Sequence, residues 1–238
     1  MKYSLVMPYI DRLEVFKRTC ESLLFHYADR KDFEIILVED SKNDDDIVDV
    51  LCDYADKLTI VHVPCVNPGF NPSPLINAGV ERATGKYIIL TNPECLHLTD
   101  ILSVLDEEFK KGDDAYIVCA CQSVLDCNEP FENPETFQFK HQMWYQHTEH
   151  RDVRYHFCTA ISKKNYQTIG GFDERYADGI DYDDDAFLRS VNQSHLKVIP
   201  RDDALVLHQE HRAIRHMLPR PTLRRLHQRN KRLFEGGA

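Results

Sequence analysis

The chain has 238 residues, which suffices for one large domain with a continuous core. Its net charge of −10 combines +7 in residues 211–238 with −17 in residues 1–210. An acidic body argues against a protein that follows nucleic-acid phosphates, because such binding needs a basic surface, and it suits a cation-binding cleft.

The start of the chain and its cysteines indicate the cellular compartment. The first predicted strand begins almost at Met1, leaving no room for a leader, and no run approaches the roughly 18 apolar residues of a membrane helix. We therefore expect a cytoplasmic protein. The eight cysteines are scattered, which favours free buried thiols, and the tight pair Cys119 and Cys121 lacks the repeated ligand spacing of structural zinc.

Strands and helices alternate over the first hundred residues. Short apolar runs rich in β-branched residues predict strands, and apolar stripes of helical period predict helices. The strands are expected at 3–7, 33–38, 58–63 and 87–90, and the helices at about 15–26, 47–54 and 75–83. Asp11 is a plausible N-cap of the first helix; Ser73, Pro74 and Gly85 mark the ends of the third.

This order predicts a mostly parallel sheet with helices on both faces. In such sheets, ligands bind beyond the carboxyl ends of the strands. We therefore expect function just after Met7, Val38 and Leu90. A helix at about 100–111 and a strand at 115–121 follow. The polar segment 126–152, which contains Trp144, is either a binding flap or an ordered surface loop.

Three polar clusters follow predicted strands or lie farther on, at 39–40, 92–94 and 181–185. Each has a structural interpretation. Asp40 can end a strand beside a helix cap, and residues 183–185 can occupy a first helical turn, where the helix dipole favours acids. Asp185 can also pair with Arg189 across one turn.

The succession of these motifs resembles the family 2 glycosyltransferases and relatives with the GT-A fold, over nearly the whole chain. Residues 5–12 are similar to the family's opening strand and donor-binding turn, and 38–41 to its Val-Asp-Asp-x-Ser element. Residues 77–79 and 170–176 resemble later family elements. The resemblance implies a GT-A α/β fold with a smaller acceptor-side subregion. It also implies a set of donor-binding residues: Pro8, Tyr9, Arg12, Asp40, Asn77, Gly79 and Asn92.

The family's metal-binding DxD motif falls on Asn92-Pro93-Glu94. This is a departure, because an amide and a glutamate replace the two aspartates. A divalent cation, Mn²⁺ or Mg²⁺, accepts both oxygen types, so Glu94 is the expected ligand and Asn92 acts through water. The resemblance makes His208, after a predicted strand, the second metal ligand, with His211 as the competing candidate.

The acidic motif, Asp183-Asp184-Asp185, resembles the family's Glu-Asp-x-Asp element. Aligned on Arg189, it makes Asp183 the catalytic base with Asp184 beside it, while Tyr182 replaces the usual glutamate. Acceptor contacts are expected from Trp144, Gly171 and Asp185.

The resemblance implies inverting transfer of a sugar from a nucleotide-diphosphate donor, with UDP-sugar favoured, to a hydroxyl of a glycan or lipid-linked acceptor in polysaccharide biosynthesis. One alternative is a catalytically inactive nucleotide-sugar-binding protein, motivated by Asn92. A nucleotidyltransferase would need a glycine-rich phosphate loop after the first strand, and residues 7–11 contain no glycine.

We expect one domain over 1–238, with a nucleotide-sugar-binding half at 1–98 and an acceptor and catalytic half at 99–210. The basic tail at 211–238 has the pattern of an amphipathic helix starting near Arg212. Such a helix binds an anionic membrane surface or contacts donor phosphates; the alternative is a solvated helix packed by its leucines.

Overall fold

The computed structural model describes residues 1–127, 129–211 and 218–236. Its strands are β1 (Tyr3–Tyr9), β2 (Phe33–Asp40), β3 (Ile60–Cys65), β4 (Tyr87–Thr91), β5 (Cys95–His97), β6 (Ala115–Leu125), β7 (Lys140–Gln146), β8 (Cys158–Ser162) and β9 (Lys197–Gln209). Its helices are α1 (Leu13–Tyr27), α2 (Ile47–Tyr54), α3 (Ser73–Arg82), α4 (Ile101–Phe109), α5 (Lys163–Thr168), α6 (Asp183–Gln193) and α7 (Arg220–Phe234), with a 3₁₀ turn η1 at Glu174–Tyr176. The elements predicted up to residue 121 are confirmed, and most differences lie at their ends.

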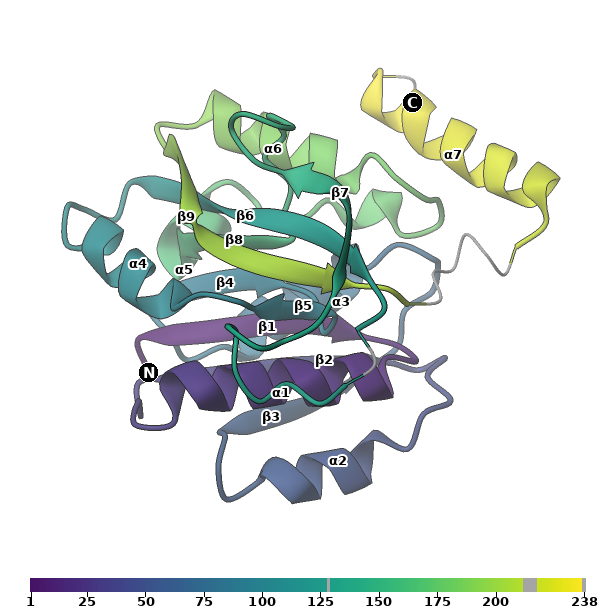
Figure 1. Cartoon of the computed structure of the whole chain (residues 1–238). Coiled ribbons are helices and arrows are strands. Elements are labelled where there is room, and N and C mark those ends of the chain that lie inside the picture. Colours follow the sequence, from purple (N-terminus) through teal and green to yellow (C-terminus); the bar gives the residue numbers. More distant parts are fainter. Residues whose placement is uncertain (128, 212–217, 237–238) are drawn as a thin grey trace.

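The strands form one mixed sheet (Figure 1). Its order is β3-β2-β1-β4-β8-β6-β9-β5, with β7 added beside β6. The first four strands in chain order are mutually parallel, as predicted, whereas β8 runs antiparallel to both β4 and β6. The parallel part brings the carboxyl ends of β1, β2 and β4 to the same edge of the sheet.

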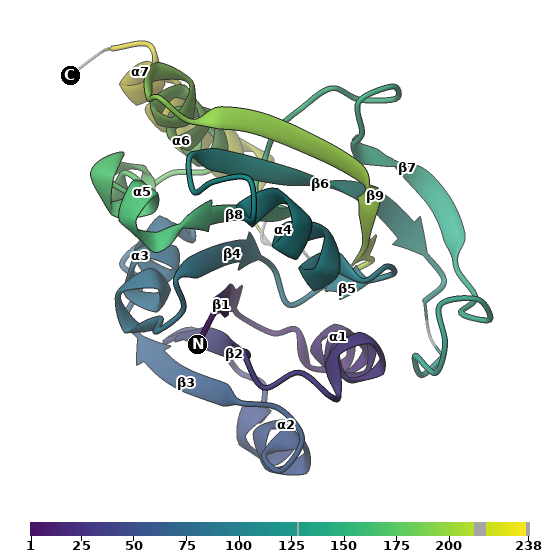
Figure 2. The same ribbon diagram turned by 90° about the vertical axis from the view of Figure 1, so that its left-hand side faces the viewer.

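Helices cover both faces of the sheet (Figure 2). Leu5 and Met7 of β1 lie in a core cluster that includes residues of α1, α2 and α4. Val6, between them, lies in a second cluster with residues of α3, α5 and α6. Side chains alternate along a strand, so a strand buried on both faces is mostly apolar, and the buried Ser4 of β1 is paired with Glu34 of β2.

The predicted cap of α1 is wrong. Asp11 has a φ of 50°, and its amide donates to Asn43 Oδ1 at 2.9 Å. The amide of Leu13, the first residue of α1, donates instead to Asp45 Oδ2 at 3.0 Å. The acidic loop after β2 therefore supplies the acceptor for this helix end, which no local pattern reveals.

The cap of α3 also differs from the prediction. The N-cap position is Pro72, which has no capping side chain, and Asn71 Oδ1, one residue earlier, accepts bonds from the Ser73 amide at 3.0 Å and the Ser73 hydroxyl at 2.6 Å. The helix ends at Arg82, before Gly85. A Cβ on Gly85 would lie 2.7 Å from the backbone nitrogen of Ser4, so glycine is required there for close approach to β1.

The C-terminal helix α7 is docked on the body beside α6 (Figure 1). The Asn230 side chain is fully buried, and its Nδ2 donates to the carbonyls of Tyr176 at 3.1 Å and Asp181 at 2.9 Å. Phe234 lies under the Arg189 guanidinium, 3.6 Å from ring centroid to Cζ. Arg189, which the sequence pairs with Asp185, thus contacts α7. Residues 212–217 of the predicted tail helix lie outside the described residues.

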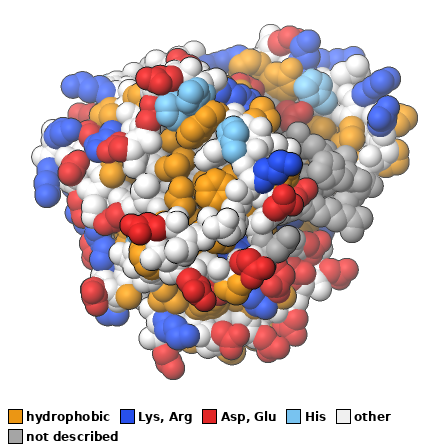
Figure 3. Space-filling view, in the orientation of Figure 1, with side chains coloured by type: hydrophobic (Ala, Val, Ile, Leu, Met, Phe, Trp, Pro, Cys, Tyr) orange, Lys and Arg blue, Asp and Glu red, His pale blue; other side chains and the backbone are white. Residues whose placement is uncertain are grey.

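Charged side chains of both signs are mixed over the left part of the view in Figure 3, with local excesses elsewhere. Figure 3 shows basic side chains over α7 and many acidic ones in the lower part of the view, where α2 lies in Figure 1. Leu226 of α7 is buried, so this part of the predicted apolar stripe faces the protein. Among the described residues, no helix is both long and apolar enough to span a bilayer.

Candidate active site

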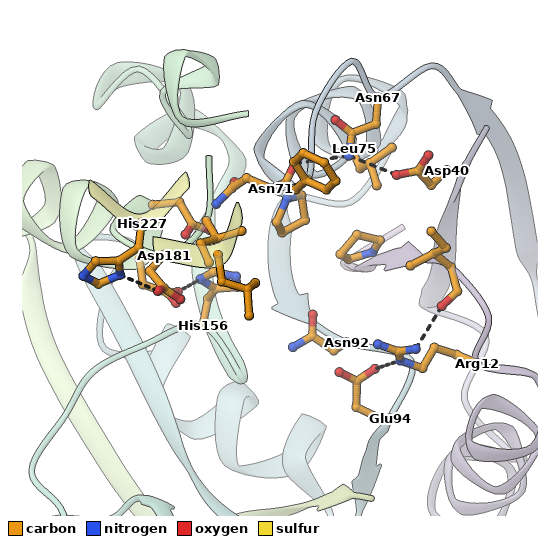
Figure 4. A pocket seen from close by; sticks show the side chains of 18 of the residues that line it. Arg12, Asp40, Asn67, Asn71, Leu75, Asn92, Glu94, His156, Asp181 and His227 are labelled. Carbon is orange, nitrogen blue, oxygen red and sulfur yellow. Dashed lines mark hydrogen bonds and ion pairs between the residues drawn. The ribbon is translucent and has the colours of Figure 1, made fainter. Parts of the chain in front are cut away.

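A cavity of about 600 Å³ lies at the carboxyl ends of β1, β2 and β4. Pro8, Asp40 and Asn92 line it, so a cavity lies at the strand ends where the sequence predicts ligand binding. The opposite wall comes from the first turn of α6 and from α7, which contributes Leu223, Arg224, His227 and Gln228. Figure 4 shows Asp40 and Asn67 on one side, His227 and Asp181 on the other, and Arg12 with Glu94 below them.

Asp40 is held in a fixed orientation at one end of the cavity. It is 4% exposed and accepts bonds from the Lys42 amide at 2.9 Å and from Asn67 Nδ2 at 3.0 Å. The Lys42 ammonium lies 3.2 Å from the same carboxylate and offsets part of its charge. The sequence singled out Asp40 but not Asn67, whose role depends on a contact across 27 positions of the chain.

Three residues predicted to bind the donor (Tyr9, Asn77 and Gly79) do not line this cavity, and neither does Gly171, predicted to contact the acceptor. Tyr9 is fully buried and its hydroxyl donates to Asp45 at 3.0 Å, because alternation along β1 turns it away from Pro8. Asn77 holds α3 to the glycine turn, accepting bonds from the Tyr166 hydroxyl and the Phe172 amide and donating to the Phe172 carbonyl.

The two glycines in this group have packing roles. Gly171 has a φ of 65°, and a Cβ there would lie 2.8 Å from Asn77 Oδ1. A Cβ on Gly79 would lie 2.5 Å from Val6 Cγ1 and 2.8 Å from Val38 Cγ2, so this glycine lets α3 approach the sheet. The structure therefore corrects the donor-binding assignments of Tyr9, Asn77 and Gly79 and the acceptor assignment of Gly171.

Gly79→Ala tests the corrected role. Overpacking costs about 1–3 kcal/mol and alanine's better helix propensity offsets about 1, so we expect a net destabilisation of about 1 kcal/mol in urea unfolding. The affinity of the folded protein for a nucleoside diphosphate should stay within about twofold of wild type. Weaker ligand binding at unchanged stability would restore the direct role.

Glu94 lies between two histidines at the centre of the cavity wall. His208 Nε2 is 3.4 Å and His211 Nε2 3.8 Å from Glu94 Oε1, and Arg12 Nε is 3.5 Å from Oε2. The register of β5 on β9 brings His208 opposite Cys95, the neighbour of Glu94. Both histidines that the sequence offered as alternatives therefore lie beside Glu94.

The chemistry of this group suits a divalent cation. One ligand atom from each of Glu94, His208 and His211 lies within 4.8 Å of the others. Burial opposes ionisation of Glu94, but the His208 hydrogen bond and the charges of His211 and Arg12 outweigh it and lower its pKa to about 2. Burial also lowers the pKa of His211 to about 4. An ionised carboxylate beside a neutral imidazole is a donor set for Mn²⁺.

A strained turn presents the acidic motif to the cavity. Asp181 and Tyr182 have φ values of 62° and 68°, a left-handed conformation that costs on the order of 1 kcal/mol for each non-glycine residue. The docked helix α7 holds this turn, because His227 Nδ1 lies 2.8 Å from Asp181 Oδ2 and Asn230 binds the Asp181 carbonyl. Asp183, the first residue of α6, follows directly.

Asp183 and Asp184 have different surroundings. Asp183 is 7% exposed, and burial together with the charge of Asp184 raises its pKa to about 6, although His156 and a hydrogen bond with Asn71 oppose the shift. Asp184 pairs with His156 Nδ1. Burial lowers the pKa of His156, but the Asp184 charge more than offsets this, so the net shift is upward. Sequence analysis did not identify His156, because this residue, just before β8, belongs to none of the motifs described above.

A second cavity of about 860 Å³ adjoins the first and shares Glu94 and Asp184 with it. Asp185 lines it and accepts a bond from the Tyr155 hydroxyl at 3.0 Å. Trp144 lines neither cavity; its ring packs against those of His147 and His150, with centroids 4.5 and 5.1 Å away. Of these two predicted acceptor contacts, Asp185 therefore lines a cavity and Trp144 lines neither of the two.

The fold is shared with several solved structures. Residues 1–349 of TarS from S. aureus match with a TM-score of 0.67 and 12% identity, covering 88% of this chain and 60% of that one. The mannosyltransferase PcManGT from Pyrobaculum calidifontis, in complex with GDP-Man and Mn²⁺, matches with a TM-score of 0.63 and 13% identity over 96% and 60% of the two chains. GalNAc-T7 with UDP, GalNAc and Mn²⁺ matches with a TM-score of 0.66 and 14% identity over 88% and 44%.

The chain thus spans about 60% of the length of the first two of these proteins. A search of curated proteins found no match. The model of glycosyl transferase family 2 matches residues 4–170, which include β1 to β8 and most of the residues that form the first cavity's sheet side. The chain has the GT-A fold and belongs to glycosyl transferase family 2.

Proposed function

We propose that the protein transfers a sugar from a nucleoside-diphosphate donor, with UDP-sugar favoured, to a hydroxyl of a glycan or lipid-linked acceptor. The observation that supports this most strongly is one cavity lined by Asp40, Glu94 and Asp183. In such a cavity, Asp40 binds the nucleotide base, Glu94 holds a charge-stabilising ion and Asp183 accepts a proton. Family membership adds support, as does the presence of UDP-GlcNAc in a TarS structure with the same fold.

Glu94, His208 and His211 would hold the metal ion. Two imidazoles with one carboxylate favour Mn²⁺ over Mg²⁺, since Mg²⁺ prefers oxygen ligands. When bound, the ion supplies positive charge that stabilises the departing diphosphate. Arg12 lies 3.5 Å from Glu94 and adds a permanent positive charge on the same side of the cavity.

Asp183 is the proposed base. Both Asp183 and Asp184 line the cavity, but Asp184 is already paired with His156. The Asp183 carboxylate takes the proton of the acceptor hydroxyl, the acceptor oxygen bonds to the anomeric carbon, and the bond from that carbon to the β-phosphate oxygen breaks with its electron pair. A single displacement of this kind inverts the anomeric centre.

The pH dependence of transfer follows from the raised pKa of Asp183, about 6. A base acts in its deprotonated form, so we expect kcat/KM at saturating Mn²⁺ to fall about tenfold per pH unit below the pKa and to level off above about pH 7. Steady-state rates between pH 5 and 8, with stability monitored in parallel, provide the measurement. A flat profile over this range would exclude Asp183 as the base.

Arg224 and Arg225 provide a matched pair for the role of α7. Arg224 lines the cavity, whereas its exposed neighbour Arg225 does not. We expect Arg224→Ala to weaken nucleoside-diphosphate binding about tenfold, because a charge-assisted bond to phosphate contributes about 1.5 kcal/mol, and Arg225→Ala to leave it unchanged. Titration calorimetry measures both; equal effects would indicate only a general electrostatic contribution from the helix.

Product release tests the proposed activity. The protein, Mn²⁺, a UDP-sugar panel and candidate acceptors are mixed, and released nucleoside diphosphate is measured. Acceptor-stimulated turnover is expected. Donor binding without turnover for any acceptor would favour the catalytically inactive binding protein, the alternative suggested by Asn92.

A further inference from the structure

The second cavity differs from the first in its lining, and its chemistry identifies a ligand class. We infer that this cavity binds an uncharged, hydroxyl-rich carbohydrate as the acceptor and discriminates against anionic ones. The inference rests on the proposed function and adds to it the charge class of the acceptor.

Aromatic rings line part of this cavity. Tyr145 of β7, together with Tyr155 and Phe157 from the segment before β8, lines it, and all three are half-buried. The Tyr145 ring centroid lies 5.0 Å from that of Phe157 and 4.9 Å from that of His208. Large rings exposed in a concave site present apolar surface to the C–H face of a sugar.

Carboxylates line the same cavity. Five acids line the cavity: Glu94, Asp181, Asp184, Asp185 and Glu210. Arg151 is the permanently charged cation among the described lining residues, and its guanidinium donates to the Tyr145 carbonyl at 3.0 Å. The lining histidines lie beside acids already counted: His208 and His211 beside Glu94, and His227 beside Asp181.

This charge balance selects by repulsion as well as by attraction. An ionised carboxylate accepts hydrogen bonds but donates none, so it suits sugar hydroxyls. A carboxylate has about four acceptor sites, and Asp185 accepts one bond from Tyr155, so it retains capacity for a ligand. A phosphate, sulfate or uronate beside Asp185 and Glu210, which lie outside the proposed metal site, would meet like charges, and this repulsion weakens binding.

The position of the cavity makes it the acceptor side. It shares Glu94, Asp181, Asp184 and His227 with the first cavity, so a sugar held there lies against the turn that carries Asp183. A hydroxyl directed across this shared border approaches the proposed base Asp183, which lines the first cavity.

Glycan selection tests the inference at pH 8, where an ordinary imidazole is neutral. The protein is applied, with and without UDP and Mn²⁺, to an array of neutral oligosaccharides and their matched uronate-, sulfate- and phosphate-bearing counterparts. We expect retained glycans to be uncharged and each anionic counterpart to bind at least about tenfold more weakly. Preference for anionic glycans, or retention of none, would overturn the inference.

Two aromatic variants show whether this cavity is responsible. Tyr155→Ala should lower glycan retention at least about fivefold, whereas Trp144→Ala, which removes a ring outside the cavities, should not. Equal loss in both would contradict the assignment. A separate thermal-shift measurement with UDP and Mn²⁺ tests the proposed function, because an unchanged melting temperature would reject donor binding. The array without nucleotide still decides which glycans bind, whatever that result.

Discussion

Asp183→Asn is expected to lower acceptor-dependent sugar transfer by about 10²–10⁴-fold, the contribution typical of a general base. Donor binding should change by less than about threefold, because Asp40 and Glu94 are untouched. Stopped-flow single-turnover measurement of transfer, with calorimetry of nucleoside-diphosphate binding, separates the two effects.

The same substitution should stabilise the protein. The folded-state pKa of Asp183, about 6, lies above the value of an unfolded aspartate, so the folded state binds the proton more tightly. Folding stability therefore falls as pH rises from about 4 through 6, and ionised Asp183 is a net cost at neutral pH. Removing the charge should raise the free energy of unfolding at pH 7.5 by on the order of 2 kcal/mol.

Loss of transfer together with a higher melting temperature cannot result from misfolding. The matched control is Asp185→Asn, two positions along the same helix, which should keep more of the transfer rate and show no comparable stabilisation. An Asp183→Asn variant that transfers sugar at the normal rate would show that another group accepts the proton.

Glu94→Gln should act in the opposite direction on stability. The folded-state pKa of Glu94, about 2, lies below that of an unfolded glutamate, so ionised Glu94 stabilises the fold above about pH 4.5 and this contribution is lost as pH falls through 2. Without the charge, Arg12 loses a partner. We expect the free energy of unfolding at pH 7.5 to drop by on the order of 2–3 kcal/mol.

Glu94→Gln should also remove the response to metal. Transfer should fall at least about 100-fold, since even residues that only support metal ligands contribute 10- to 100-fold. The rise in melting temperature caused by Mn²⁺ in wild type should disappear. The control is Glu210→Gln, because Glu210 lies between His208 and His211 in the sequence but is not in the metal-binding group. This variant should respond to Mn²⁺ normally. A normal Mn²⁺ response in Glu94→Gln would contradict the assignment.

The first four parallel strands could be predicted because their signals are local. Apolar runs such as 33–38 and the alternation of strands with helices are properties of short segments, and they locate the cavity at the carboxyl ends. The family motifs added Asp183 and His208. From local patterns alone, Asp183 looks like an acid in the first turn of a helix, and His208 looks like a structural histidine.

The remaining site residues depend on contacts between distant segments. Asn67, His156 and Arg224 reach the cavity through loops and a docked helix, and a single sequence contains no record of that docking. Conversely, Asn77 and Gly79 belong to a recognisable motif, yet they hold α3 against its neighbours. A motif identifies residues that the fold requires without separating packing roles from binding roles.

Among the described residues, two groups of side chains have the composition of a metal site, and we assign the ion to one and the base to the other. Anomalous diffraction from a crystal grown with Mn²⁺ and a nucleoside diphosphate distinguishes them directly. We predict a manganese peak among Glu94, His208 and His211, next to the diphosphate. A peak among His156, Asp183 and Asp184 instead would make Asp183 a ligand and contradict its role as the base.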